Sequence, residues 1–369
     1  MNNKSINIVH LTASLNIGGA EALLVDLIET LKKNNFKQTV LYFHDGPHRK
    51  KLEKRGISTH HIKGLFCTYD PIFIIRLWGT LYKLKPNCLH TLLWSGNFFG
   101  RIMGRILKIP TIQALHNNIS QNGPIRTLLD KLTLSKNDSL IAVSHEVKQS
   151  HITFIPATQE KQITVIPNGI KPTILDKMNN HKLITRKQIG LKKEHFIIGS
   201  VGRFVPLKNY PLLLGEYSLL EKIHPHTRLL LIGYGPQEAF LRKKIKQLNL
   251  EEKVHIITGQ KAVNYYHLMD CFIQPSYKEG ISIALLEALQ TGLPTIVGNS
   301  TQNHPVIKSG YNGLLITPEK SFMKALCQLI ENPQKLKKLS TNGKKTVSDK
   351  FSHSIMAHNY EKIFRKYSQ

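Results

Sequence analysis

The sequence predicts an α/β protein of two Rossmann-like domains, each with a parallel sheet covered by helices on both faces. Short apolar runs of strand length alternate with segments of helical periodicity along most of the chain, which is the pattern of parallel strands joined by helical crossovers. The length of 369 residues fits two domains of ordinary size. The composition, with 41% apolar and 20% charged residues, is that of a globular protein.

The first half of the chain begins with this alternation. Ile6–Leu11 is an apolar run of strand length, a turn containing Gly18 and Gly19 follows, and apolar residues then recur at helical spacing from Ala22 to Leu31. A short basic helix is expected from Leu52. The remaining predictions in this half are the strands Gln38–Phe43, Thr59–Ile62, Cys88–Leu93, Pro110–Leu115 and Ser139–Val143, and the helix Ile72–Leu84.

The alternation of strands and helices begins again in the second half, after a hinge near Ile166–Ile170, where Pro and Asn-Gly interrupt the pattern. We therefore expect an N-terminal domain at 1–167 and a C-terminal domain at 168–350, and a final amphipathic helix at about 351–369 is a candidate to pack back on the first. The predicted strands are Phe196–Val201, Arg228–Ile232, Val254–Ile257, Cys271–Gln274, Thr295–Val297 and Gly313–Ile316. The predicted helices are Tyr210–Ile223, Pro236–Leu248, Ile283–Gln290 and Ser321–Ile330.

The charge balance is strongly basic. Lys and Arg number 51 against 24 Asp and Glu, a formal net charge of +27. Such a field favours anionic partners, whether nucleic acid, an acidic lipid surface or phosphorylated substrates, although a basic surface also arises from amino-acid usage alone. The four cysteines, Cys67, Cys88, Cys271 and Cys327, have neither CxxC nor zinc-site spacing, so we expect reduced thiols.

Targeting signals are not apparent in the sequence. The N-terminal segment lacks the long apolar stretch of a signal peptide. No apolar run reaches the roughly 18 residues of a membrane span, and the best candidate, Pro71–Leu81, is interrupted by Arg76. We expect a cytoplasmic protein, or one held peripherally at the inner face of the cytoplasmic membrane.

The strongest motif runs from Ser276 to Leu289, after one predicted strand and into the next predicted helix. A helix that begins near Ser282 has free backbone N–H groups at its start, and these with the helix dipole suit a diphosphate. Glu279 and Glu287 could accept hydrogen bonds from sugar hydroxyls. The structural alternative is an ordinary capped helix with incidental acids.

A second motif, Gly202 to Asn209, follows directly after the strand that ends at Val201. Cations at the carboxyl end of a strand lie where open α/β sheets bind ligands. Arg203 offers a bidentate fork to phosphate and Lys208 a point charge. A solvated loop with two basic residues is the alternative.

Together the two motifs resemble the group 1 (family 4) retaining glycosyltransferases of the GT-B fold, whose domains face a central cleft. The family pattern of Gly-Arg, then Lys, then two glutamates falls on Arg203, Lys208, Glu279 and Glu287. Smaller matches follow the family order and cover almost the whole chain: Gly18-Gly19-Ala20-Glu21, Val143-Ser144, Ile166-Pro167-Asn168-Gly169, Gly233-Tyr234-Gly235-Pro236, Gly292-Leu293-Pro294 and Gly310-Tyr311-Asn312-Gly313.

The resemblance implies a nucleotide-diphosphate sugar as donor and a role for each matching residue. Glu279 and His116 would act at the transferring sugar, and Glu287 would hold the ribose hydroxyls. The donor diphosphate would be bound by Arg203, Lys208 and the backbone of Gly280, Ile281, Ser282 and Ile283, with Gly18 and Gly19 approaching across the cleft because glycine tolerates the needed φ and has no side chain.

Two departures from the family pattern stand out. Ile281-Ser282 replaces the bulkier residue usual after Glu-Gly, and the acid usual before Gly310 is absent. There is no Asp-x-Asp motif, so we expect no metal and no cofactor, and cationic side chains with a helix terminus would stabilise the leaving diphosphate. Tyr265, Tyr266 and Asp270 are interpreted as structural.

The acceptor that the resemblance implies is a saccharide or lipid-linked precursor of a surface polysaccharide or lipopolysaccharide. An anionic membrane is a further candidate partner through a basic cluster and a basic-apolar segment. The cluster consists of Arg49, Lys50, Lys51, Lys54 and Arg55, followed by His60, His61 and Lys63. The segment consists of Arg76, Lys83 and Lys85 among Phe73, Ile74, Leu77, Trp78 and Leu81. Three alternatives remain: a nucleotide-sugar 2-epimerase of the same fold, a catalytically inactive binding protein, and a nucleic-acid-binding protein, for which the sequence contains no recognisable motif.

Overall fold

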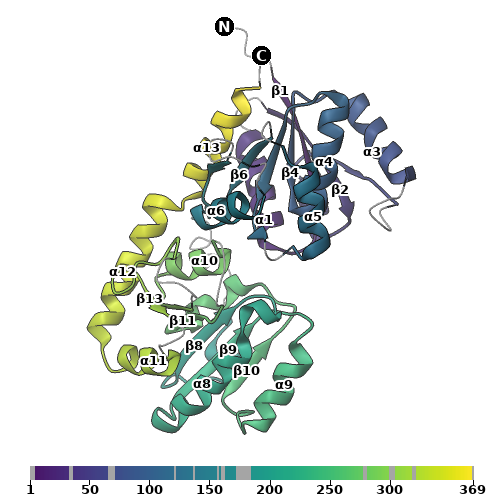
Figure 1. The fold of residues 1–369 in the computed structure, drawn as a ribbon. Helices are drawn as coiled ribbons and strands as arrows, with labels where there is room; N and C mark the ends of the chain where they lie inside the picture. The colour runs from purple at the N-terminus through teal and green to yellow at the C-terminus, as the bar shows by residue number, and fades with distance from the viewer. Residues whose placement is uncertain are drawn as a thin grey trace. The chain divides into compact units, whose positions relative to one another are not determined.

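The computed structural model describes residues 5–32, 36–64, 71–119, 122–135, 138–155, 158, 163–171, 184–276, 281–298, 304–317 and 321–367. The chain divides into two compact units. The N-terminal unit comprises Met1–Asn168 and His353–Gln369, and the C-terminal unit comprises Gly169–Ser352. Each unit contains one sheet of parallel strands (Figure 1), which confirms the predicted fold class.

The N-terminal unit has a seven-stranded sheet in the order β3-β2-β1-β4-β5-β6-β7. Its strands are β1 (Ile6–Ser14), β2 (Phe36–His44), β3 (Ser58–His61), β4 (Cys88–Leu92), β5 (Thr111–Leu115), β6 (Ser139–Ala142) and β7 (Ile163–Val165). Its helices are α1 (Gly19–Leu31), α2 (Pro47–Glu53), α3 (Pro71–Leu84), α4 (Leu93–Leu107), α5 (Pro124–Thr133), α6 (His145–Phe154) and α13 (His353–Arg365).

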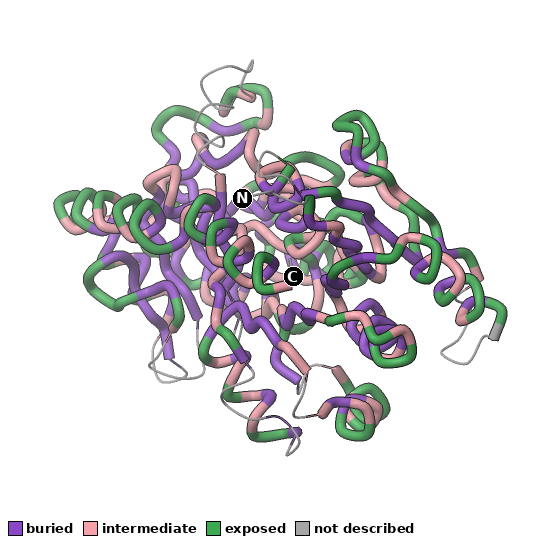
Figure 2. The backbone as a smooth tube through the Cα atoms, turned by 90° about the horizontal axis from the view of Figure 1, so that it is seen from above, coloured by how far each residue is buried: buried purple, intermediate pink, exposed green. Residues whose placement is uncertain are grey.

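Alternate residues of each strand face opposite sides of this sheet. Leu41 and Phe43 of β2 pack with Phe73 of α3 and with α4, whereas Val40 and Tyr42 pack with α1 and α2. Helix α13 contacts α1. The layer formed by α3 and α4 is therefore on one face and the layer formed by α1, α2 and α13 on the other. Buried and exposed residues alternate along the helices, because each helix buries only one of its sides (Figure 2).

Helix α4 is absent from the prediction above because it follows β4 with no intervening loop and contains three glycines. Glycine lowers helix propensity, but here it allows the helix to lie close to the sheet. A Cβ atom at Gly100 would come within 2.3 Å of the Thr91 side chain, and one at Gly104 within 2.0 Å of Thr111 Oγ1. Helices α5 and α6 and the short strand β7 were likewise not predicted.

Three buried polar side chains are joined by hydrogen bonds beneath α13. His10 of β1 and His90 of β4 are joined through their Nδ1 atoms at 2.9 Å, and His10 Nε2 lies 3.1 Å from Gln38 Oε1. Burial lowers the pKa of His10 to about 4 and lowers that of His90 as well, so both rings are neutral near pH 7. Phe364 of α13 packs edge-on against both rings, which ties the end of the chain to the N-terminal sheet.

The C-terminal unit has a six-stranded sheet in the order β10-β9-β8-β11-β12-β13. Its strands are β8 (Phe196–Val201), β9 (Thr227–Ile232), β10 (Val254–Ile257), β11 (Cys271–Gln274), β12 (Thr295–Gly298) and β13 (Leu314–Ile316). Its α-helices are α8 (Tyr210–Ile223), α9 (Glu238–Gln247), α10 (Ile283–Thr291), α11 (Phe322–Ile330) and α12 (Pro333–Lys350), with 3₁₀ turns η4 (Arg186–Ile189), η5 (Pro206–Lys208), η6 (Ala262–Asn264) and η7 (Tyr266–Leu268).

The strands predicted in this half are confirmed within a residue or two, while α12 was not predicted. Two buried clusters fill the two faces of the sheet, one with α10 and η7 and the other with α8, α9 and α11. Cys88 and Cys271 are buried free thiols and Cys327 is also free; Cys67 lies outside the described residues. Among the described helices, none is both long enough and apolar enough to cross a bilayer.

Candidate functional site

The cation-bearing loop of the C-terminal unit leaves the carboxyl end of β8. Phe204 is fully buried in the core, and the residues on either side of it are fixed by backbone hydrogen bonds. Arg203 is exposed, and Lys208, at the end of η5, is half-buried. Arg203 forms no ion pair with any residue that the structure describes. The buried phenylalanine thus anchors a loop whose basic side chains lie nearer the surface.

Two glycines in the loop after β9 allow that loop to pack against the loop of Arg203. Phe204 N donates to Tyr234 O at 2.8 Å, and Gln237 N donates to Phe204 O at 3.0 Å. A Cβ atom at Gly233 would lie 1.9 Å from Gly202 O, and one at Gly235 would lie 2.6 Å from Phe204 O. The position of Arg203 therefore depends on the absence of side chains after β9.

The glutamate-bearing motif leaves the neighbouring strand, β11. Strands β8 and β11 pair in parallel, with Ile198 opposite Cys271, so their following loops emerge at the same edge of the sheet. Ser282 caps α10, its hydroxyl accepting from Leu285 N at 3.4 Å. Ile281 and Ser282 are buried and Ile283 is half-buried, while Glu279 and Gly280 lie outside the described residues.

Glu287 lies on α10, one turn beyond its start, and is half-buried. Its carboxylate accepts a hydrogen bond from the Tyr266 hydroxyl, with 2.8 Å between Tyr266 Oη and Glu287 Oε2. Tyr266 is fully buried, and burial followed by the charge of Glu287 raises the pKa of its hydroxyl well above its usual value. The phenol therefore stays protonated and remains a hydrogen-bond donor.

In the N-terminal unit, Gly18 and Gly19 follow β1 and begin α1. Gly18 has φ −158° and ψ 162°, an extended conformation open to any residue, so the expectation that this glycine supplies an unusual φ is wrong. The missing side chain matters more, because a Cβ atom at Gly18 would lie 2.3 Å from Glu21 Oε2. Ser14 holds the same carboxylate through a hydrogen bond of 2.7 Å.

His116 lies one residue beyond β5, at the same sheet edge as Gly18. The residue is half-buried, its Nε2 atom is buried, and that atom has no hydrogen-bond partner among the described residues. Burial lowers the pKa of His116 to about 4. The ring is therefore neutral near pH 7, which suits hydrogen bonding to a hydroxyl better than neutralising a phosphate.

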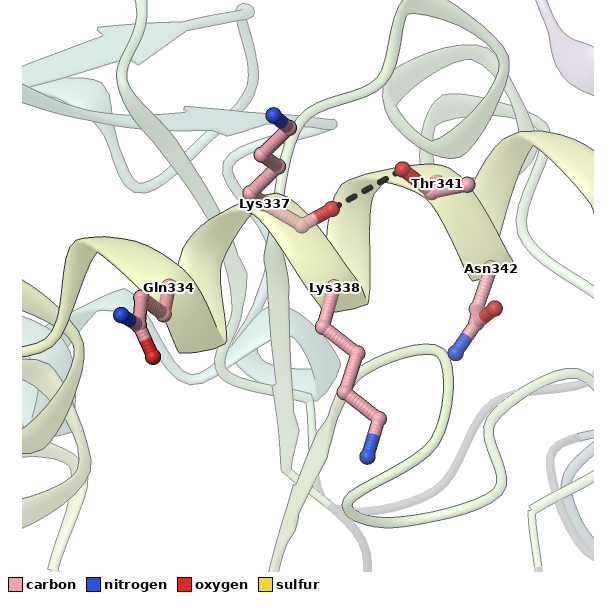
Figure 3. Close-up of a pocket in the computed structure, with 5 residues that line it drawn as sticks. All are labelled: Gln334, Lys337, Lys338, Thr341 and Asn342. Carbon is pink, nitrogen blue, oxygen red and sulfur yellow. Dashed lines mark hydrogen bonds between the residues drawn. The ribbon is translucent and has the colours of Figure 1, made fainter.

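A surface pocket of about 360 Å³ lies along α12, well apart in sequence from these loops, and is lined by Gln334, Lys337, Lys338, Thr341 and Asn342 (Figure 3). The Thr341 hydroxyl donates to Lys337 O at 3.0 Å. No residue of the candidate site lines this pocket. In the described part of the chain, no group of three or more His, Cys, Asp or Glu side chains is arranged to hold a metal ion.

Family models of known proteins match both units of the chain. The model of the family "Glycosyltransferase Family 4" matches residues 17–173, and that of "Glycosyl transferases group 1" matches residues 182–346. The UDP-Gal:alpha-D-GlcNAc-diphosphoundecaprenol alpha-1,3-galactosyltransferase of Escherichia coli is 25% identical, over 89% of this chain and 88% of its own length.

Two further similarities extend over nearly the whole chain. The capsular polysaccharide biosynthesis glycosyltransferase CapM of Staphylococcus aureus is 24% identical over 92% of each chain. The crystal structure of Anabaena HepE in complex with UDP-glucose superimposes with a TM-score of 0.83 and 20% identity, covering 98% of this chain and 100% of that one. The chain belongs to the group 1 glycosyltransferases of the GT-B fold, and it is an enzyme that transfers glycosyl groups.

The contact between Tyr266 and Glu287 could not be predicted from the sequence. Tyr266 is buried, as its structural interpretation implies, and its hydroxyl also donates a hydrogen bond to Glu287. The two residues are far apart in the sequence and on different elements, η7 and α10, so neither spacing nor periodicity connects them. A tyrosine in an apolar stretch was the available signal, because a buried phenol usually has a hydrogen-bond partner.

We expect Gly233→Ala to destabilise the C-terminal unit by about 1–3 kcal/mol, the usual cost of overpacking, because the new Cβ atom would collide with Gly202 O. Urea unfolding followed by circular dichroism measures this change. Both tryptophans of the chain, Trp78 and Trp94, lie in the N-terminal unit, so the unfolding transition seen by tryptophan fluorescence should stay near its wild-type position.

Gly215→Ala is the matched control. Gly215 lies inside α8, and no atom lies within 4 Å of a Cβ placed there. Alanine should therefore stabilise the same unit by about 0.5–1 kcal/mol through helix propensity. Equal stability of the two variants would show that the close approach of Gly233 to Gly202 is not needed.

Proposed function

We propose that this glycosyltransferase moves a sugar from a nucleotide-diphosphate donor to a saccharide or lipid-linked acceptor, with retention of configuration at the anomeric carbon. The observation that carries the proposal is the pairing of β8 with β11. It brings the loop of Arg203 and Lys208 and the loop that begins α10 to the same edge of one sheet, where open α/β sheets bind their ligands.

The donor diphosphate fits this edge by charge. Arg203 and Lys208 supply positive charge, and we assign the backbone amides of Gly280, Ile281, Ser282 and Ile283, which lead into α10, as further hydrogen-bond donors. When the glycosidic bond breaks, negative charge grows on the departing diphosphate, and preorganised donors and cations stabilise it. No metal or cofactor is part of the proposal.

The remaining site residues act on the sugars of the donor. We assign Glu279 to the transferring sugar and Glu287 to the ribose hydroxyls. From the family resemblance, we also assign Gly18 and Gly19 to the diphosphate and His116 to the transferring sugar. The Nε2 atom of His116, which has no hydrogen-bond partner among the described residues, provides a hydrogen-bonding position. Retention follows from attack on the same face of the sugar through an oxocarbenium-like state.

The acceptor proposal rests on the relatives. The name of the Escherichia coli enzyme specifies a diphosphoundecaprenol-linked sugar, and that of CapM specifies capsular polysaccharide. We therefore propose a precursor of a surface polysaccharide or lipopolysaccharide, reached from the cytoplasmic side of the membrane. Because the relatives transfer sugars, they favour transfer over 2-epimerisation, and incubation with donor alone should yield no epimer.

We expect Lys208→Ala to weaken binding of a nucleoside diphosphate by about 1.5–3 kcal/mol, the range for a hydrogen bond to a charged group. Calorimetric titration of UDP, GDP and ADP identifies the best ligand and then measures the change. Lys243→Ala, an exposed lysine on α9, removes the same charge from the same unit and should leave affinity unchanged. Equal losses in both variants would indicate a general charge effect and overturn the assignment of Lys208 to the diphosphate.

We expect Glu279→Ala to reduce sugar transfer while leaving nucleoside diphosphate affinity nearly unchanged, because Glu279 is assigned to the transferring sugar alone. Glu287→Ala should instead weaken the nucleoside diphosphate, since its ribose hydrogen bonds are lost. Transfer rates and calorimetric affinities of both variants distinguish the roles. The reverse pattern would mean that the two glutamates have been assigned the wrong way round.

A further inference from the structure

Two helices of the N-terminal unit expose rows of large apolar side chains. On α3 the exposed residues Ile72, Ile75, Trp78 and Tyr82 lie on one side of the helix, and the rings of Trp78 and Tyr82 stack at 5.4 Å. On α5 the exposed residues are Ile125, Leu128 and Leu132, at i, i+3 and i+7. Ile75 is 65% exposed and Leu132 73%. Helix α4 contacts both α3 and α5, whose positions are seen in Figure 1. We call the exposed sides of α3 and α5, with the exposed residues of α4, the α3–α5 face.

These apolar rows are not displaced core residues, because both helices already bury another side. Phe73, Leu77 and Leu81 of α3 are fully buried against the sheet. Helix α5 is held by Asp130, which forms a buried ion pair of 2.8 Å with Arg101 of α4 and accepts a hydrogen bond from Trp94 Nε1. The exposed rows are therefore a second surface, beyond what the fold requires.

The exposed charged residues on the described parts of α3, α4 and α5 are all basic. The sequence contains no Asp or Glu from Pro71 to Leu129, and Asp130 is buried. The exposed basic residues on α3, α4, α5 and their ends are Arg76, Lys83, Lys85, Arg105, Lys108, Arg126 and Lys131. Arg105 is paired with Asp138. The α3–α5 face thus combines apolar rows with cations and lacks an exposed acid on its helices.

The structure corrects the membrane surface expected from the sequence. On α2, Arg49 pairs with Asp45 and Glu53, and Lys51 lies 3.9 Å from both Asp26 and Glu29. Arg55 also pairs with Glu29. Three of the apolar residues expected to join the surface, Phe73, Leu77 and Leu81, are in the core. Three cations of the α2 cluster, Arg49, Lys51 and Arg55, are therefore balanced by acids, and the α3–α5 face is the better candidate.

We propose that the α3–α5 face rests on an anionic lipid bilayer. Apolar side chains that enter the interface, together with cations that meet acidic headgroups, are the combination that binds proteins peripherally. A second copy of the chain would bring two positively charged faces together. A nucleic acid would match the cations but leave the apolar rows in water.

Flotation with vesicles tests the proposal without any donor or acceptor, so its outcome is independent of the transfer reaction. The protein should bind vesicles of phosphatidylcholine with phosphatidylglycerol and dissociate from them as salt rises. It should not bind vesicles of phosphatidylcholine alone. Arg76→Glu with Lys83→Glu should lower the partition coefficient by at least about 30-fold, since each basic residue near an anionic surface contributes about five-fold. Ile75→Ser with Trp78→Ser should abolish binding.

The matched control is Lys50→Glu with Lys54→Glu, which makes the same change in charge on two exposed residues of α2 and should leave binding intact. In a Trp94→Phe background, the fluorescence of Trp78 should shift to the blue on anionic vesicles. Circular dichroism verifies that each variant is folded. Binding to neutral vesicles, no binding at low salt, or an equal loss in the α2 variant would overturn the proposal. So would a dimer, seen by light scattering, that the serine variant dissociates while vesicle binding persists.

Tyr266 contacts Glu287, and a second inference from this contact rests on the role proposed for Glu287. We infer that Tyr266 is a positioning residue, whose hydroxyl fixes the carboxylate that holds the ribose. Its ring is buried in the core beside Phe272, η7 packs against α10, and the hydrogen bond to Glu287 is 2.8 Å. The carboxylate is thus oriented by a group that itself cannot move freely.

Tyr266→Phe should lower nucleoside diphosphate affinity about five-fold, the effect of one hydrogen bond, and should leave the affinity for inorganic pyrophosphate unchanged. In a Glu287→Ala background the same change should have no further effect. Tyr217→Phe is the matched control, since it removes a buried hydroxyl that donates to Thr227 O at 3.0 Å in the same unit. That variant should keep full affinity.

These experiments distinguish the role proposed for Glu287 from the role proposed for Tyr266. If Glu287→Ala does not weaken binding, the role of Glu287 fails. If Glu287→Ala weakens binding but Tyr266→Phe does not, only the positioning role of Tyr266 is overturned. An effect of Tyr266→Phe that persists without Glu287, or that Tyr217→Phe reproduces, would also overturn it.

Discussion

The parallel pairing of strands is the constraint on which the candidate site depends. In a parallel sheet all carboxyl ends meet at one edge, so loops from distant parts of the chain become neighbours. Gly18 and His116 follow β1 and β5 in one sheet, and Arg203 and Ser282 follow β8 and β11 in the other. Because β8 pairs directly with β11, the cationic loop and the beginning of α10 share one edge without any other contact having to bring them together.

Close approach of backbone segments then sets the loops within this framework. Gly233 and Gly235 allow the chain after β9 to support the loop of Arg203, and Phe204 anchors that loop in the core. In the N-terminal unit, Gly100 and Gly104 bring α4 against the sheet in the same way. The interior is close-packed, so one added methyl group at such a position would displace the loop of Arg203 or the helix α4.

The large basic excess is distributed unequally over the N-terminal unit. On α2 most of the cations are balanced by acids of α1 and of α2 and its flanks, which makes that side an ordinary solvated surface. On the α3–α5 face the cations accompany exposed apolar residues, and no acid is exposed on its helices. Net charge alone cannot distinguish these sides, because it does not record which charges face one another.

The sequence by itself determined the α/β class and most strands, because buried strands must be apolar, and it determined which motifs follow which strands, because their order lies in the chain itself. It did not reveal α4, whose glycines lower local helix propensity but fit against β4 and β5. Nor did it show that Phe73 is buried while Ile75 is exposed, since a helix that is apolar on several sides does not specify which side meets the sheet. The contact of Tyr266 with Glu287 was likewise decided by the tertiary structure, because packing of η7 on α10 joins residues that no local pattern links.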